Sequence, residues 1–89
     1  MKDSLPFEEN WVSENISIRR FKQTSKSDEL KWHFDEEDRI IESIGETDWM
    51  FQYDNKLPQE IKDRIFIRKG EWHRLIKGSG DLEIKITRI

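Results

Sequence analysis

The stretch RIFIRKGEWHRLIKGSGDL, residues 64–82, decides the fold. Its first part alternates apolar Ile65 and Ile67 with other residues, and its second part alternates in the same way and carries His73. A period of two is typical of strands that bury one face. Because glycine readily adopts turn conformations, the sequence predicts strands over residues 64–68 and 71–77, joined as a hairpin by a tight turn at Lys69-Gly70.

The other histidine lies in a second alternating segment, LKWHFD, residues 30–35. Successive side chains of a strand point to opposite faces, so His33 and Asp35 share one face with Lys31. If this segment and residues 71–77 are antiparallel neighbours in one small barrel, the imidazoles of His33 and His73 face each other across its interior. This convergence is the main functional signal in the sequence.

Further alternating runs cover residues 15–22, with Ile16 and Ile18 on one face, and residues 39–44, 49–54 and 82–89. Gly45 favours a turn, and residues 57–63 predict a loop or a one-turn helix that begins near Pro58. Residues 1–13 show no clear periodicity and predict an N-terminal arm. Short strands at regular spacing indicate a single all-β barrel or sandwich over residues 14–89.

Composition narrows the classes of function. The 89 residues suffice for one domain, and the net charge of -3 comes from acidic and basic residues that are interspersed along the chain. A duplex nucleic-acid partner is therefore not expected. The chain contains no cysteine, and no apolar run approaches the ~18 residues of a membrane span. We expect a cytoplasmic protein with no membrane partner.

Two motifs resemble those of the cupin superfamily, whose members are small antiparallel barrels of jelly-roll type. The first cupin motif has the form His-x-His, three or four residues, Glu, six residues, Gly. Here His33 is followed by Asp35 at the second histidine, by Arg39 at the glutamate and by Gly45 at the glycine. The usual glutamate ligand is thus replaced by a residue that does not coordinate cations.

The second cupin motif has the form Gly, five residues, Pro-x-Gly, two residues, His. Lys62 replaces its first glycine and Arg68 its proline, whereas Gly70 and His73 match. The resemblance covers about residues 30–86 and implies a cupin-like jelly roll. Small cupins commonly pair through an edge strand or an exchanged N-terminal arm, so the resemblance and the apolar residues of the arm together predict a homodimer.

Two chemical interpretations of the interior remain open. His33, Asp35 and His73 form a two-histidine, one-carboxylate set of the kind that binds iron(II) and leaves positions open for oxygen or substrate. Iron, manganese, nickel and zinc are all candidates for this site. The structural alternative is that the two histidines are partly buried and hydrogen-bond to Asp35, Gln52 or the backbone.

The second interpretation uses Arg39 as a binding group. With Lys31, Gln52 and His73 nearby, Arg39 is suited to hold a carboxylate or phosphate of a small anionic ligand. Its structural alternative is an ion pair with Asp35 or Glu42.

These interpretations lead to three hypotheses about function. The leading one is a pocket with a divalent metal and an anionic ligand, with chemistry of dioxygenase or isomerase type. The alternative is a non-catalytic protein that binds a sugar, a nucleotide or another small anion without metal. A purely structural module with a packed interior is the third.

Overall fold

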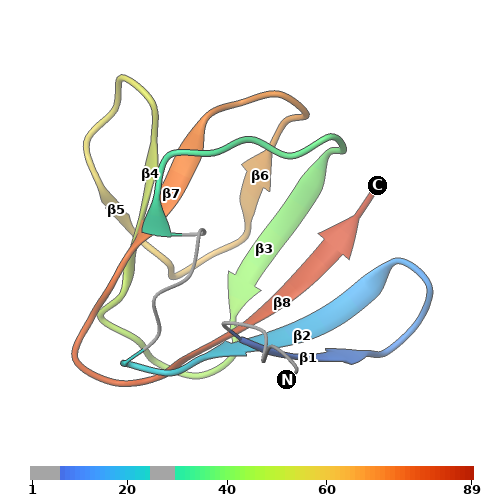
Figure 1. Ribbon diagram of the computed structural model, residues 1–89, viewed down its shortest axis with the longest axis horizontal. Coiled ribbons are helices and arrows are strands. Elements are labelled where there is room, and N and C mark those ends of the chain that lie inside the picture. Colours follow the sequence, from blue (N-terminus) through green and yellow to red (C-terminus); the bar gives the residue numbers. More distant parts are fainter. Residues whose placement is uncertain (1–6, 25–29) are drawn as a thin grey trace, which may run out of the picture.

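The protein, described over residues 7–24 and 30–89 of a computed structural model, is built from two antiparallel β-sheets (Figure 1). The described residues contain no α-helix. The eight strands are β1 (Glu8–Trp11), β2 (Ile16–Phe21), β3 (Arg39–Ser43), β4 (Met50–Tyr53), β5 (Gln59–Glu60), β6 (Ile65–Ile67), β7 (His73–Ile76) and β8 (Leu82–Arg88).

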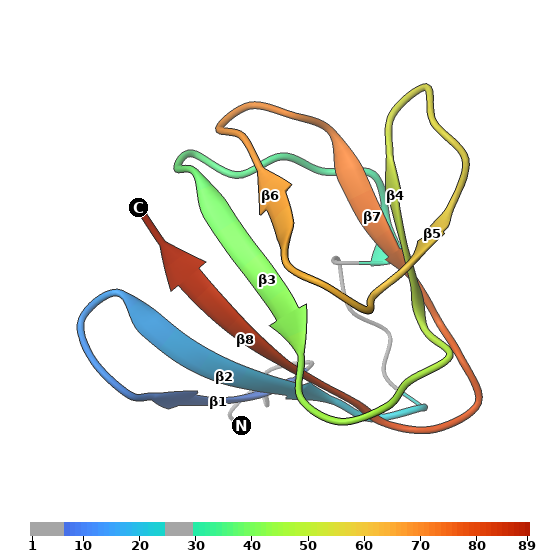
Figure 2. The same ribbon diagram turned by 180° about the vertical axis from the view of Figure 1, so that it is seen from behind.

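The first sheet has the strand order β1-β2-β8-β3-β6, and the second has the order β5-β4-β7. The two sheets face each other at an angle, and the chain passes repeatedly from one to the other (Figure 2). This arrangement confirms the predicted all-β, jelly-roll-like fold. Among the described residues, no helix is long and apolar enough to cross a membrane.

The core lies between the sheets and follows from the alternation along the strands. In β8, Leu82, Ile84 and Ile86 are buried, whereas the residues between them point outward. Each inward position meets a neighbour from the adjacent strands, so the core is one continuous apolar layer. Its members are Phe21, Ile41, Trp49, Phe51, Ile61, Ile65, Ile67, Leu75, Leu82, Ile84 and Ile86.

The predicted hairpin over residues 64–77 is wrong. Ile65 and Ile67 are buried as expected, but β6 pairs with β3 in the first sheet, and β7 pairs with β4 in the second. The turn does form, with Gly70 at a φ of 80°, and it carries the chain from one sheet to the other. A tight turn is therefore compatible with a sheet crossover as well as with a hairpin.

Three other local predictions need correction. Residues 30–35 form no strand; a single antiparallel bridge joins His33 to His73. The segment around Pro58, expected to be a loop or a one-turn helix, is irregular apart from the short strand β5 and contains no helical turn. Residues 8–11, expected to be part of an irregular arm, form the edge strand β1 beside β2, whereas residues 1–6 of that arm lie outside the described residues. The expected homodimer stays a prediction.

The buried face of β2 is the polar one. Ile16 and Ile18 share a face, as their spacing requires, but they are only partly buried. Ser17, Arg19 and Phe21 are the residues that face the core. This orientation places a guanidinium inside the molecule, which the apolar pattern of the sequence does not indicate.

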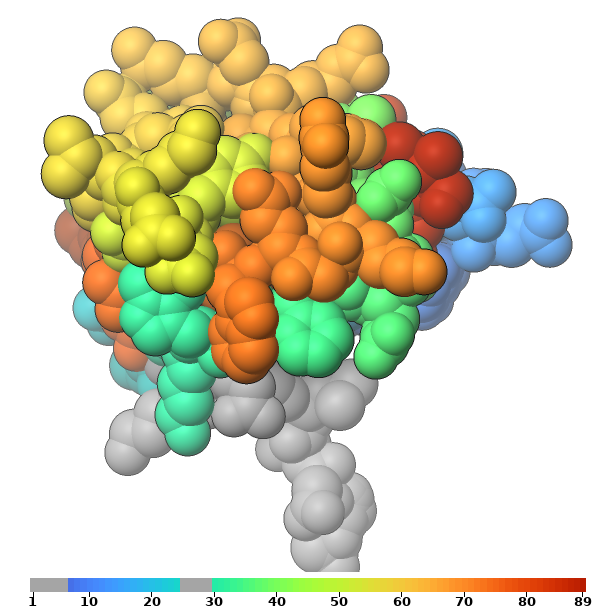
Figure 3. Space-filling view, turned by 90° about the horizontal axis from the view of Figure 1, so that it is seen from above, coloured from blue at the N-terminus to red at the C-terminus, as the bar shows by residue number. Residues whose placement is uncertain are grey.

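Aromatic side chains also collect on the outside of the second sheet. Trp32, Phe34 and Trp72 are each more than 40% exposed, and the rings of Phe34 and Trp72 meet edge to face with centroids 5.1 Å apart. Figure 3 shows the segments around residues 32 and 72 side by side on one face of the molecule. These rings therefore lie outside the interior, which the neighbouring histidines face.

Candidate metal centre

The backbone brings His33 and His73 together. Each of the two residues donates its amide to the carbonyl of the other, with N–O distances of 3.0 and 2.9 Å. Directly opposed residues of an antiparallel pair point to the same face, and the imidazole centroids lie 4.3 Å apart. The predicted contact between the two segments is thus confirmed, although it takes one bridge and not two strands.

A backbone hydrogen bond fixes the orientation of each imidazole. Nδ1 of His33 lies 2.8 Å from the carbonyl oxygen of Lys31, and Nδ1 of His73 lies 2.7 Å from that of Glu71. A carbonyl oxygen only accepts hydrogen bonds, so Nδ1 carries the proton in both rings. With its proton on Nδ1, an imidazole in the neutral form presents the lone pair of Nε2 to the interior, which is the tautomer that a metal ion requires.

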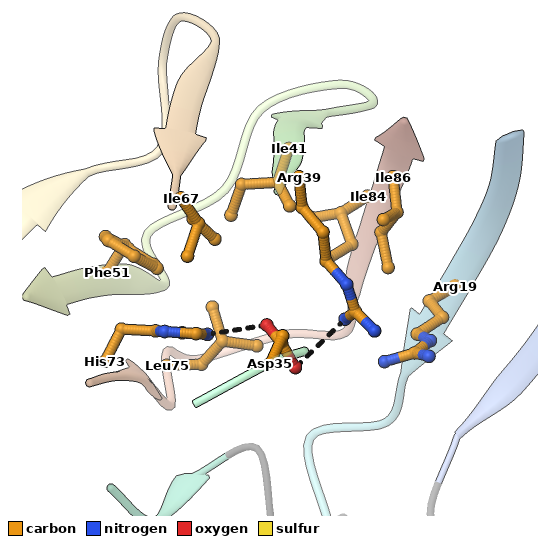
Figure 4. Close-up of a pocket in the computed structure, with 10 residues that line it drawn as sticks. All are labelled: Arg19, Asp35, Arg39, Ile41, Phe51, Ile67, His73, Leu75, Ile84 and Ile86. Atoms are coloured by element: carbon orange, nitrogen blue, oxygen red, sulfur yellow. Dashed lines mark ion pairs between the residues drawn. The ribbon is translucent and has the colours of Figure 1, made fainter. Parts of the chain in front are cut away.

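Asp35 completes the set. Its Oδ2 lies 3.3 Å from Nε2 of His73, and its Oδ1 lies 3.4 Å from Nη1 of Arg39 (Figure 4). The ligand atoms of His33, Asp35 and His73 all lie within 4.8 Å of one another. At metal–ligand bond lengths of about 2.1 Å, such atoms are about 3 to 4 Å apart, so small movements would close the set around an ion.

The buried carboxylate favours a cation at this position. Asp35 Oδ2 is buried and has no hydrogen bond of good geometry, which is costly for a charged oxygen. Burial raises the pKa of Asp35, but the interaction with His73 and the positive charge of Arg39 outweigh it and hold the pKa below its usual value. Asp35 is therefore ionised at neutral pH, and the donor set fits a divalent metal ion.

Arg39 stands beside this set as a fixed positive charge. Its Nε and Nη2 lie 2.7 and 2.6 Å from one carboxylate oxygen of Glu37, Oε2. The guanidinium thus bridges Glu37 and Asp35. The ion pair between Arg39 and Asp35, which was one structural alternative, is present. On its other side Arg39 pairs with Glu37 rather than with Glu42.

A small cavity adjoins the three-residue set. About 20 Å³ of it is available to the centre of a water molecule, which is enough for one water. Arg19, Asp35, Arg39 and His73 form its polar side (Figure 4). The rest of its lining is apolar and consists of Ile41, Phe51, Ile67, Leu75, Ile84 and Ile86.

The structure does not bring every predicted binding residue to this cavity. Lys31 is exposed, and neither its side chain nor that of Gln52 is part of the lining. The amide of Gln52 accepts a hydrogen bond from Arg74 Nε at 2.9 Å and donates one to the carbonyl of Lys56 at 2.8 Å. The side chains of Gln52 on β4 and of Arg74 on β7 both point away from the core, so Gln52 lies on the outer face of the second sheet.

A second group of charged residues escaped the sequence analysis. Oε2 of Glu9 accepts hydrogen bonds from Ser17 Oγ at 2.7 Å, Arg19 Nε at 2.9 Å and Arg88 Nη2 at 3.1 Å. Burial raises the pKa of Glu9, but these bonds and the charge of Arg19 outweigh it and lower the pKa. Arg88 follows the buried Ile84 and Ile86 at the same spacing of two, which is the one signal that could have revealed it.

Comparisons with known proteins show which solved structures this chain resembles. No family model matches the sequence, and no curated protein matches it significantly. A solved protein from Neisseria meningitidis is 15% identical, with a TM-score of 0.63 over 100% of this chain and 89% of its own. A cupin domain from Bordetella pertussis Tohama I is 11% identical, with a TM-score of 0.58 over 93% of this chain and 91% of its own.

Two further neighbours have names that describe a chemistry. A protein from Ralstonia eutropha JMP134 proposed to be a mannose-6-phosphate isomerase is 10% identical, with a TM-score of 0.61 over 92% of this chain and 81% of its own. The iron(II) form of HppE is 14% identical, with a TM-score of 0.59 over 83% of this chain and 41% of its own. The chain therefore has the cupin fold, as its two motifs indicate.

Proposed function

We propose that the protein binds one divalent metal ion through His33, Asp35 and His73, and that it binds a small anionic ligand beside this ion. The observation that carries the proposal is the orientation of the two imidazoles. Nδ1 of each ring donates to a backbone carbonyl, so Nε2 of each ring is the nitrogen left to join the carboxylate of Asp35 in holding an ion. Three such donors leave further coordination positions for ligand or oxygen.

Iron, manganese, nickel and zinc all accept this donor set. The iron(II) structure among the neighbours supports iron, and the neighbour proposed to be a sugar-phosphate isomerase supports an anionic substrate. A bound ion would supply Lewis-acid or redox chemistry of isomerase or dioxygenase type. The chain itself would orient the ligand anion through Arg39 and exclude water with the apolar wall around Ile67 and Leu75.

A non-catalytic binding protein is the second candidate. The cavity has room for about one water, so the body of a substrate does not fit inside without movement of the walls. Arg39 also stands where a fourth protein ligand is common in cupin motifs. Both observations favour a protein that holds a small anion at the mouth of the barrel and performs no reaction.

Elemental analysis of the untagged protein, purified without chelator or added metal, tests the metal site. We expect about one equivalent of iron, manganese, nickel or zinc per chain, and its loss in His73→Ala. Gln52→Ala is the matched control, because Gln52 lies on the outer face of the neighbouring strand. Equal metal content in wild type and His73→Ala would sink the proposed site.

A further inference from the structure

Charged side chains form a continuous chain across one end of the interior. It starts at Glu9 on the edge strand, runs through Arg88 and Glu37 to Arg39, and ends at Asp35 and His73. Most of these groups are held from several sides. Glu37 is the most exposed member of this chain, because its side chain is 38% exposed whereas those of Arg39 and Arg88 are 14% and 12% exposed.

One oxygen of Glu37 sits where two arginines converge. Glu37 Oε2 lies 2.7 Å from Nε and 2.6 Å from Nη2 of Arg39, and 3.7 Å from Nε of Arg88. The Nε–Nη2 edge of a guanidinium is the fork that binds carboxylates and phosphates. In this structure a carboxylate of the chain itself occupies that fork.

Each of the two arginines has at least one partner besides Glu37. Nη1 of Arg88 donates to Ser17 Oγ at 2.9 Å and Nη2 to Glu9 at 3.1 Å, while its guanidinium covers the ring of Trp11 at 4.3 Å. Arg39 is the first residue of β3 and contacts Asp35 through Nη1 at 3.4 Å. Removal of the Glu37 carboxylate would therefore leave two cations that each keep a partner on the protein.

The backbone around Glu37 is fixed on both sides. The carbonyl of Asp35 accepts a hydrogen bond from the amide of Gly70 at 2.9 Å, and the carbonyl of Asp38 accepts one from Ile89 at 3.0 Å. Asp38 Oδ1 also accepts from the amide of Lys69 at 2.7 Å. Departure of Glu37 from the fork thus needs only a change of side-chain rotamer, which is fast at a partly exposed position.

From this geometry we infer that Arg39 and Arg88 form an oxyanion site and that Glu37 fills it until a ligand carboxylate or phosphate takes its place. The inference rests on the anion-binding part of the proposed function and specifies where the anion binds. A ligand oxygen at this position contacts the arginine that also touches Asp35, so it lies next to the three-residue donor set. Glu37 is then an internal competitor that a ligand must displace.

Titration of the metal-free protein with inorganic phosphate tests the site. Side-chain Nε–Hε signals of Arg39 and Arg88 report binding by NMR. Glu37→Ala removes the competitor and should bind phosphate roughly tenfold more tightly, as expected for the loss of a partly exposed, charge-assisted pair. Glu36→Ala, which removes the same charge from the neighbouring exposed position, should stay within about twofold of wild type.

A parallel titration with acetate distinguishes a carboxylate ligand from a phosphate ligand. The anion whose affinity increases more in Glu37→Ala is the one that the site prefers. Arg88→Lys keeps a positive charge but loses the Nε–H group that faces the Glu37 position, so it should weaken phosphate binding in the Glu37→Ala background. Equal affinities of Glu37→Ala and Glu36→Ala for both anions would overturn the inference. Metal content, measured on each variant before the metal is removed, reports the failure of the metal site separately.

Discussion

A bound metal ion should raise the Tm of the protein, and the size of this rise depends on the unfolding entropy and hence on the length of the chain. An ion that binds only the folded state, present at 100 times its Kd, stabilises it by about 2.7 kcal/mol. For 89 residues and an unfolding entropy of about 2.1 cal/mol/K per residue, this corresponds to a rise in Tm of about 14 °C. The donor atoms are already within 4.8 Å of one another, so binding of the ion needs only small movements.

Differential scanning calorimetry of chelator-treated protein measures this rise with zinc, manganese and nickel in air, and with iron(II) under nitrogen. His73→Ala removes one of three donors and should abolish the rise, even if its own starting Tm is lower. Gln52→Ala should show the full rise, because its side chain binds Arg74 on the outer face. The reasoning is refuted if none of the four ions raises the Tm of wild type, or if His73→Ala gains as much.

Three further outcomes follow from individual residues. The folded-state pKa of Glu9 is lowered, so the ionised carboxylate stabilises the fold above its ordinary pKa of about 4.5, and this contribution is lost as the pH falls through the lower folded pKa. In urea unfolding between pH 2 and 7, Glu9→Gln should therefore lose less stability on acidification than wild type. Gly70 has a φ of 80° with open space around it, so Gly70→Ala should lower the free energy of unfolding by about 1 to 2 kcal/mol from backbone strain alone. Gly80 lies in open space without such a φ, so Gly80→Ala should change the free energy of unfolding by less than about 0.5 kcal/mol. Arg39→Ala should keep the metal content of wild type and lose phosphate binding in the NMR titration; retained phosphate affinity would contradict its role.

The alternation of side chains was enough to predict which residues of the site share a face. His33 and Asp35 are two apart, and His73 lies in a segment whose alternate residues are apolar. Their convergence required only that the two segments be neighbours, which the His33–His73 bridge confirms. Local regularity beyond that bridge was not needed, so the absence of a full strand at residues 30–35 did not affect the result.

The charged end of the interior was not predictable in the same way. Ile16 and Ile18 would by hydropathy face the core, yet Arg19 is the buried neighbour on β2. A buried arginine is tolerable only when partners across the fold bond to it, and its partner Glu9 lies on a strand that the sequence did not reveal. Hydropathy evaluates one residue at a time and does not detect such pairs.

The sequence by itself determined the all-β class, the buried alternation of β8, the turn at Gly70 and the His33–Asp35–His73 set, because each depends on the two-residue period of a strand or on a local backbone preference. Only the tertiary structure decided that β6 and β7 belong to different sheets and that Glu37 occupies the fork of Arg39. The period fixes which face of a strand is buried, but the strand's hydrogen-bonding partner and the partner of a buried charge depend on residues distant in the chain, whose contacts form only when the sheets pack together.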